Sequence, residues 1–240
     1  MIEWLRQSDE PQQIELSGRA LPIDLRRHPT AKRLTLRLAP DGSAVRITMP
    51  KWCASRDALA FAKARRTWLE TQLAKVPAPR NPVSEGCIDY RGRTLQIEWD
   101  EALPRTAQVD GDCLRIGGPK DTLAPRLQRW LEREALRMFE QDAADYCERA
   151  SLPVAAVRVS RAKRRWGSCS SKGVLRMNWR LVQAPDHVRR SVVAHEVAHL
   201  VHFDHSPAFH ALLARIYEDD MRVADAWLKT HGRTLYATFG

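Results

Sequence analysis

The amino-acid sequence predicts an α+β protein in which a β-rich N-terminal part with one helix packs on a more helical C-terminal part. Short segments of alternating apolar and polar residues fill the first 118 residues and are separated by turns that contain Gly. This pattern is typical of antiparallel strands. From about residue 122 the apolar residues recur three and four positions apart, which indicates a helix with one buried face. The change of period gives two expected parts, 1–118 and 119–240.

The N-terminal part begins with a predicted β-hairpin and a helix. Residues 34–38 and 45–49 alternate between apolar and polar types on either side of Asp41-Gly42, a dipeptide that is favoured in hairpin turns. Ser55 can cap a helix whose apolar residues recur at helical spacing. Three prolines within residues 76–86 then indicate a linker or a surface crossing.

Two further strand pairs and a long helix follow. The strand pairs are expected to turn at Arg91-Gly92 and near Asp110-Gly111. The helix that begins near residue 122 has an apolar face made of Leu127, Leu131, Ala135, Met138 and Phe139.

Two shorter strands and another helix complete the prediction. Val157 and Val159 indicate a short strand, and the alternation over residues 175–181 predicts a half-buried one. Its polar face would leave Arg176 and Arg180 at a surface or in a cleft. Ala184-Pro185-Asp186 should end this strand and start a helix, because Pro suits the first helical position and Asp suits the first turn.

Composition narrows the class of protein. The formal net charge is +10 and the pI is about 9.8. Such a surface attracts nucleic acid, anionic membranes or acidic substrates, or simply keeps the protein in solution. No apolar run is long enough to span a bilayer, and residues 1–13 contain no apolar signal core. The five cysteines form no Cys-x-x-Cys pair. We therefore expect a cytoplasmic protein with free thiols and no membrane partner.

The most informative motif is His195-Glu196-Val197-Ala198-His199. Two histidines four positions apart lie on one face of a helix, where both can reach one ion. The glutamate between them can accept a proton from water, as in zinc peptidases. Apolar residues surround the motif and predict a buried helix. Hydrogen bonding of these polar groups to each other or to the backbone is the alternative to a metal site, since buried polar groups need partners.

A hydrolytic zinc ion needs a third protein ligand and an open position. His205 lies six residues after His199, the spacing also found in metzincins, although His202 stands where those enzymes have Gly. Phe203-Asp204 would then turn the chain, since Asp tolerates a left-handed conformation better than most residues, and Ser206-Pro207 would start a new helix. Glu218 is the rival candidate for the third ligand. If Glu218 does not bind metal, we expect it to be a solvated acid beside Asp219 and Asp220.

Four segments carry a resemblance to the YgjP-like zinc metallopeptidase family, which is related to the SprT-like proteases. In chain order, they are Arg165-Trp166-Gly167-Ser168-Cys169, Asn178-Trp179-Arg180-Leu181, His195 to Leu200, and His205-Ser206-Pro207-Ala208-Phe209. The resemblance implies a zincin-type fold for the C-terminal part and His205 as the third zinc ligand. It also implies that residues 165–169 border the active cleft. The sequence differs from the family at residue 210, where His210 replaces the expected aromatic residue. His210 can pack against its neighbours, bind substrate or compete for the metal.

Two residues near the expected cleft have open roles. Cys169 can act as a soft zinc ligand or as a small buried residue. Arg165 can stabilise an oxyanion or remain solvated.

A basic stretch lies just before the motif. No acidic residue occurs between Glu148 and Asp186, whereas nine basic residues do: Arg149, Arg158, Arg161, Lys163, Arg164, Arg165, Lys172, Arg176 and Arg180. The stretch can bind nucleic acid or an acidic substrate, or it can form a solvated face.

We interpret the sequence as that of a zinc metallopeptidase. Zn²⁺ would bind His195, His199 and His205, and Glu196 would be the general base acting on a peptide or protein substrate. Two alternatives remain: a nucleic-acid-associated protease or DNA-binding protein, and a metal-binding scaffold without catalysis. The intact Glu196 argues against the scaffold, because a metal site alone does not require it.

Overall fold

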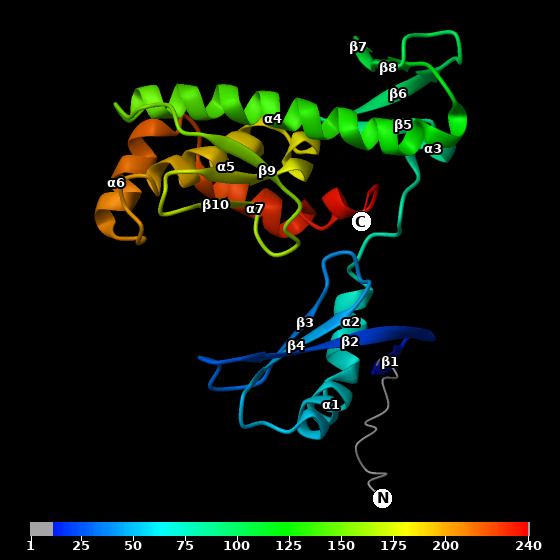
Figure 1. The fold of residues 1–240 in the computed structure, drawn as a ribbon, viewed down its shortest axis with the longest axis vertical. Coiled ribbons are helices and arrows are strands. Elements are labelled where there is room, and N and C mark those ends of the chain that lie inside the picture. Colours follow the sequence, from blue (N-terminus) through cyan, green and yellow to red (C-terminus); the bar gives the residue numbers. More distant parts are fainter. Residues whose placement is uncertain (1–11, 240) are drawn as a thin grey trace, which may run out of the picture. The chain divides into compact units, whose positions relative to one another are not determined.

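A computed structural model describes residues 12–239 and shows a mixed α+β architecture with several small sheets (Figure 1). The predicted fold class is therefore confirmed at this level. The chain divides into two units, residues 1–78 and 79–240. Most of the segment 1–13, in which the sequence shows no signal core, lies outside the described residues.

The first unit is a four-stranded sheet covered by two helices. The strand order is β1-β2-β4-β3, and β3 and β4 form the predicted antiparallel hairpin. Apolar side chains of the sheet pack against Ala58, Ala62, Leu69 and Leu73. The elements are β1 (Gln13–Leu16), β2 (Arg19–His28), β3 (Thr35–Leu38), β4 (Val45–Pro50), α1 (Ser55–Ala64) and α2 (Arg66–Leu73). Ala54, not Ser55, occupies the N-cap position of α1.

The second unit begins with the short helix α3 and another four-stranded sheet, in the order β5-β6-β8-β7. Both predicted strand pairs are present. The sheet shares one hydrophobic core with the long helix α4, since Ile88, Leu95 and Leu114 lie in the same cluster as Leu127 and Leu131. The bounds are α3 (Pro82–Glu85), β5 (Cys87–Tyr90), β6 (Arg93–Trp99), β7 (Gln108–Asp110), β8 (Cys113–Ile116) and α4 (Leu123–Arg149).

The shared core explains why the units differ from the two parts expected from the sequence. The change of period near residue 118 marks the end of a sheet and the start of a helix, but it does not mark the edge of a core. The units instead separate between Ala78 and Pro79, inside the Pro-rich segment 76–86.

The remainder of the second unit holds a three-stranded sheet and three helices. The strand order is β10-β11-β9, so β10 is an edge strand that pairs with β11 alone. The elements are η1 (Lys120–Thr122), β9 (Val157–Ser160), β10 (Gly167–Cys169), β11 (Leu175–Asn178), η2 (Trp179–Gln183), α5 (Asp186–Ala198), α6 (Pro207–Ile216), α7 (Met221–His231) and η3 (Thr234–Tyr236).

The strand predicted over residues 175–181 is shorter than expected. It ends at Asn178, whose side chain accepts a hydrogen bond from the backbone N–H of Arg180 and starts the 3-10 helix η2. Arg180 is consequently buried, at 4% exposure, and it contacts the rings of Trp179 and Tyr236. The prediction that Arg180 lies at a surface or in a cleft was wrong, because period-two alternation stops where the 3-10 helix begins. Arg176 is exposed, as predicted.

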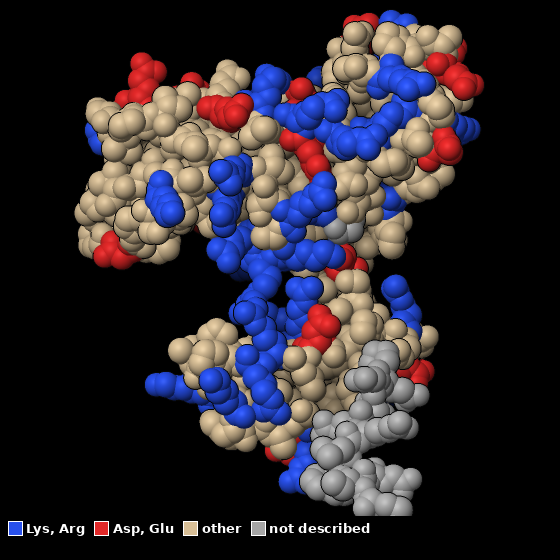
Figure 2. Space-filling model, in the orientation of Figure 1, with Lys and Arg blue, Asp and Glu red and all other residues tan. Residues whose placement is uncertain are grey.

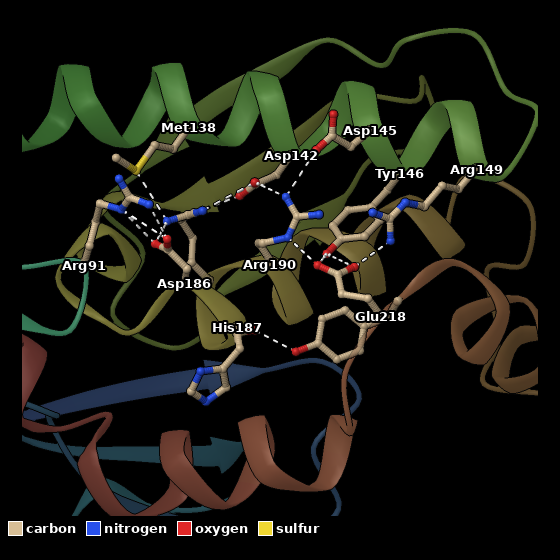
Figure 3. A network of polar contacts seen from close by, with 12 residues as sticks. Arg91, Met138, Asp142, Asp145, Tyr146, Arg149, Asp186, His187, Arg190 and Glu218 are labelled. Atoms are coloured by element: carbon tan, nitrogen blue, oxygen red, sulfur yellow. Dashed lines mark hydrogen bonds and ion pairs between the residues drawn. The ribbon is translucent and has the colours of Figure 1, made fainter.

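A network of ion pairs joins α5 to α4 (Figure 3). Arg189 donates to Asp142 over 2.8 Å, and the two side chains are only 5% and 4% exposed. Arg190 donates to the same carboxylate over 2.9 Å. At the start of α5, Asp186 accepts hydrogen bonds from Arg189 and from Arg91 in the β5–β6 turn. The helix is thus attached to α4 by a buried ion pair and to the β5–β6 turn by a more exposed one.

All five cysteines are free thiols, as expected from their spacing. Within residues 12–239, none of the helices combines the length and the apolarity needed to span a bilayer.

The buried pair gives a stability prediction. Asp142→Ala should lower the free energy of unfolding of the second unit by about 3–5 kcal/mol, because the buried Arg189 would keep only the partly exposed Asp186 as a partner and Arg190 would lose one of its carboxylates. Urea titration followed by circular dichroism measures this change. Arg222→Ala, which removes an exposed pair with Asp220, should leave the midpoint almost unchanged. Equal midpoints for Asp142→Ala and the parent chain would show that the pair does not hold α5 in place.

Candidate metal centre

Three imidazoles converge where α5 ends and α6 begins. The Nε2 atom of His195 lies 3.1 Å from Nε2 of His199 and 3.3 Å from Nε2 of His205. One ligand atom from each ring lies within 4.8 Å of the others. The structure therefore brings together the three histidines that the sequence proposed as ligands.

The local sequence explains this convergence. Apolar residues bury α5 on most of its surface, and His199 is the C-cap residue of the helix. The Nδ1 atom of His199 lies 2.9 Å from the carbonyl oxygen of His202, which closes the turn after the helix. Ser206 then accepts a hydrogen bond from the backbone N–H of Phe209, with Pro207 in the first turn of α6. This helix start was predicted from Ser206-Pro207.

The ring of Phe209 contacts all three imidazoles. The side chain is fully buried, and its ring centroid lies 5.0 Å from that of His195, 4.6 Å from His199 and 4.8 Å from His205. The turn itself requires no left-handed residue, because the non-glycine residues with positive φ in residues 12–239 are Ser17, Arg91 and Ser151. The left-handed conformation considered for Asp204 is therefore not used.

The protonation states favour metal binding. Burial and, to a smaller extent, the neighbouring histidines lower the pKa of His195 to about 4, so this ring is neutral at neutral pH. His199 Nδ1 faces a carbonyl oxygen and must carry a proton to donate to it. The Nε2 atom of a neutral His199 therefore presents a lone pair.

Hydrogen bonds alone cannot account for the three rings in their neutral forms. His199 Nε2 has no proton to donate, and His195 Nε2 carries at most one. If His195 donates to His199, its Nε2 cannot also accept from His205. If it accepts from His205, its contact with His199 is unsatisfied. A cation satisfies both contacts, and nitrogens that share a tetrahedral zinc ion at ~2.0–2.1 Å stand about 3.3 Å apart. The donor set thus fits such an ion.

Glu196 lies beside the imidazoles but is not one of the converging donors. Its side chain is 6% exposed and packs against β10. The backbone N–H of Cys169 donates a hydrogen bond to it, and a Cβ atom at Gly167 would stand 2.5 Å from its Oε1 atom. Burial raises the pKa of Glu196 to about 7, although that hydrogen bond and the charge of Arg165 both act to lower it. Only glycine at residue 167 leaves room for the carboxylate in this position. A glycine in the sequence allows such a close approach, but the sequence did not identify Glu196 as the neighbour.

Glu218 is occupied elsewhere. It accepts hydrogen bonds from Arg149 over 2.6 Å, from Arg190 over 2.6 Å and from Tyr146 over 3.0 Å (Figure 3). Burial alone would raise the pKa of Glu218, but these partners outweigh it and lower the pKa to about 2. The acid is therefore not a member of the histidine cluster. It is exposed, as the alternative of a solvated acid expected, and it is also paired with three side chains.

The other residues near the site lie outside the cluster of donors. His210 is exposed, with its ring centroid 6.4 Å from that of His205. Cys169 lies half-buried on β10, and burial raises the pKa of its thiol, with Glu196 adding to the rise. Arg165 is exposed and acts on Glu196 through its charge.

The comparison with protein families agrees with this geometry. A profile of the YgjP-like metallopeptidase domain matches residues 32–231, which is most of the chain. The chain belongs to the YgjP-like metallopeptidase family. Comparisons with curated proteins and with solved structures gave no match. Membership assigns the chain in general to the metal-dependent peptidases, and the matched segment includes residues of both units.

Part of the basic stretch of this YgjP-like domain forms ion pairs within the protein or is buried. Arg149 pairs with Glu218, Arg161 pairs with Glu132 over 2.9 Å, and Arg180 is buried. Arg149 and Arg161 are exposed despite these pairs, and the other exposed members are Arg158, Arg164, Arg165, Lys172 and Arg176. Arg158 and Arg176 are direct neighbours across β9 and β11, where like charges oppose pairing.

The Glu196 pocket gives a second prediction. Gly167→Ala should reduce peptide hydrolysis about 100-fold, because the new methyl group displaces the carboxylate from its position. Metal content should stay the same, since the three imidazoles are untouched. Gly111→Ala is the control: its φ of +58° strains the new residue locally, but the methyl group meets no other atom and is in a different sheet, so activity should be kept. Full activity in Gly167→Ala would mean that the close approach of β10 to Glu196 is irrelevant to the chemistry.

Proposed function

We propose that this metallopeptidase is a zinc enzyme in which His195, His199 and His205 hold the ion and Glu196 is the general base. The observation that supports it best is the pair of Nε2 contacts of 3.1 and 3.3 Å, which neutral imidazoles cannot both satisfy by hydrogen bonding. The family implies a metal ion but leaves its identity open.

The donor set favours zinc in a catalytic role. Imidazole nitrogen suits zinc well, whereas magnesium and calcium prefer oxygen ligands. Three protein ligands leave one position free, as in catalytic rather than structural zinc sites. When bound, zinc would supply a Lewis acid that activates water near neutral pH.

Glu196 is suited to move a proton. In the proposed reaction one carboxylate oxygen takes a proton from the attacking water while the water oxygen bonds to the carbonyl carbon of the peptide. The same carboxyl group then gives the proton to the leaving nitrogen, and the C–N bond breaks. A cation among the imidazoles would favour the carboxylate form of Glu196, which burial alone disfavours.

The edge strand β10 is suited to bind the peptide. It pairs with β11 on one side, so an extended substrate can add to its other side by backbone hydrogen bonds. Gly167 and Cys169 of the same strand contact Glu196. A peptide bound there would pass close to the general base. A sheet edge beside the metal-bearing helix is the arrangement expected of a zincin-type fold.

A nucleic-acid-associated role through the basic stretch is the second candidate. Arg158 and Arg176 lie directly opposite each other on the exposed face of β9 and β11, and this favours the nucleic-acid role. The repulsion between the two charges lowers the stability of the strand pair, and a bound polyanion would restore that stability. This candidate would add a partner to the peptidase and would not replace the metal chemistry.

The role of Glu196 can be tested directly. Glu196→Gln should keep zinc bound, because the residue is not a ligand, and should abolish hydrolysis of a peptide library. Metal analysis and a cleavage assay measure the two effects. The parent chain treated with a chelator should lose activity and regain it with zinc. Loss of zinc from Glu196→Gln would contradict the assigned role.

The choice of third ligand gives a further prediction. His205→Ala should weaken zinc affinity by more than about 100-fold, which exceeds the loss typical of an outer-shell partner. Glu218→Ala should keep zinc and lower only stability, because Glu218 pairs with Arg149 and Arg190. Competition with a chromophoric chelator measures the affinities. If Glu218→Ala releases the ion while His205→Ala retains it, the assignment is wrong.

A further inference from the structure

A second concave site lies at the other end of α4. A pocket of about 190 Å³ forms where the loop between β6 and β7 meets the first turns of that helix. Its lining includes Arg105, Arg126, Arg129, Arg133 and Trp130, and it contains no acidic residue. In Figure 2, Lys and Arg side chains gather over this part of α4 and the neighbouring sheet.

One of these arginines is fixed in place. Arg126 donates to the backbone carbonyl oxygens of Gly117, Pro119 and Thr122, with Nη2 at 2.5 Å from Pro119 and Nε at 3.2 Å from Thr122. Carbonyl oxygens orient the guanidinium without neutralising its charge. The pocket therefore has a rigid positive wall.

The other three arginines have no acidic partner in direct contact. Within residues 12–239, Arg105, Arg129 and Arg133 make no hydrogen bond and no ion pair, and the charge of Arg133 acts on Glu134 beyond ion-pair distance. Arg129 and Arg133 are exposed and stand four positions apart on α4, a spacing at which like charges destabilise a helix. Most other arginines of this unit pair with acids, among them Arg115, Arg137, Arg149 and Arg161.

Gly118 allows two of the arginines to approach each other. Its φ is +81°, and a Cβ atom there would stand 2.9 Å from Cγ of Arg105 and 3.0 Å from Nη1 of Arg126. The two side chains thus occupy the space beside the glycine. A backbone conformation suited to glycine is here combined with a gathering of like charges, and neither feature serves the packing of the core. Local conflicts of this kind are expected at binding sites.

We propose that this pocket binds a phosphate group. Guanidinium groups match the oxygens of phosphate through paired N–H donors, and a doubly charged phosphate calls for more than one of them. A carboxylate is satisfied by a single arginine, so four are more than it needs. The pocket is smaller than the ~300–1,000 Å³ of sites that enclose drug-sized ligands. It therefore suits one phosphate group of a larger molecule, either a free nucleotide or a nucleic-acid backbone.

The pocket is separate from the metal centre. Asp142, where α4 contacts α5, lies nine residues beyond Arg133, which is about 13 Å along the helix. A phosphate in the pocket would anchor its carrier and take no part in peptide hydrolysis. The proposal therefore stands or falls independently of the zinc assignment.

Binding measurements on the full chain test the proposal. Calorimetry with inorganic phosphate, with a nucleoside triphosphate and with a short single-stranded oligonucleotide compares the parent chain with Arg129→Gln/Arg133→Gln. Both changed residues are exposed, and thermal melting checks that the fold is kept. Arg115→Gln/Arg137→Gln removes two acid-paired arginines from the same unit and serves as the control.

The pocket variant should lose affinity about tenfold or more for whichever phosphate probe binds the parent chain, because two charge-assisted contacts are lost. The control should bind like the parent. Tight binding of the triphosphate alone identifies a free nucleotide. Tighter oligonucleotide binding, with a salt dependence that flattens by about two units in the pocket variant, identifies a backbone.

Three outcomes overturn the proposal. In the first, none of the three probes binds the parent chain at low salt. In the second, the pocket variant binds like the parent or no more weakly than the control. In the third, acetate displaces the probe as well as inorganic phosphate does, which would make the pocket a carboxylate site.

Discussion

The position of α5 is the constraint on which the metal centre depends. This helix carries His195, Glu196 and His199, and the buried pair between Arg189 and Asp142 holds its N-terminal half against α4. A rotation of one residue, about 100°, would take the guanidinium away from Asp142 and leave it buried with only Asp186, on its own helix, as a partner. At the other end, Glu196 occupies the space that Gly167 leaves open on β10. Two unrelated contacts therefore fix the same rotation of one helix.

The burial that secures this position also disfavours charge within the site. Desolvation lowers the pKa of His195 to about 4 and raises the pKa of Glu196 to about 7. Both groups are thus driven towards their neutral forms. A cation would find the histidines ready to coordinate and would reverse the preference of the glutamate. Since an ion that binds only the folded chain stabilises it, part of the cost of burying these polar groups would be offset on metal binding.

Sequence patterns identified much of the fold and the three histidines. The long apolar stripe of α4, the hairpin of β3 and β4 and the spacing of His195 and His199 follow from local periodicity. Features that depend on contacts between distant segments were not predicted. The burial of Arg180 depends on Tyr236, and the pairing of Glu218 depends on Arg149 and Arg190. Likewise, a glycine at residue 167 allows a turn or a close approach to a neighbour, but the neighbour, Glu196, is known only once β10 and α5 are placed side by side.

The distribution of charge shows a similar dependence on tertiary structure. The net charge of +10 does not reveal which cations are available to a ligand. In the second unit, Arg91, Arg189 and Arg190 pair with the acids that hold α5, so they contribute to the fold. The uncompensated arginines gather instead at the N-terminal half of α4 and on the exposed face of β9 and β11. A polyanion would therefore meet two local patches on this unit rather than an evenly basic surface. The candidate metal centre itself combines a neutral His195 with a buried carboxyl group at Glu196. In the function proposed above, the uncharged peptide bond would bind there, and anionic partners would bind the separate basic surfaces of the same unit.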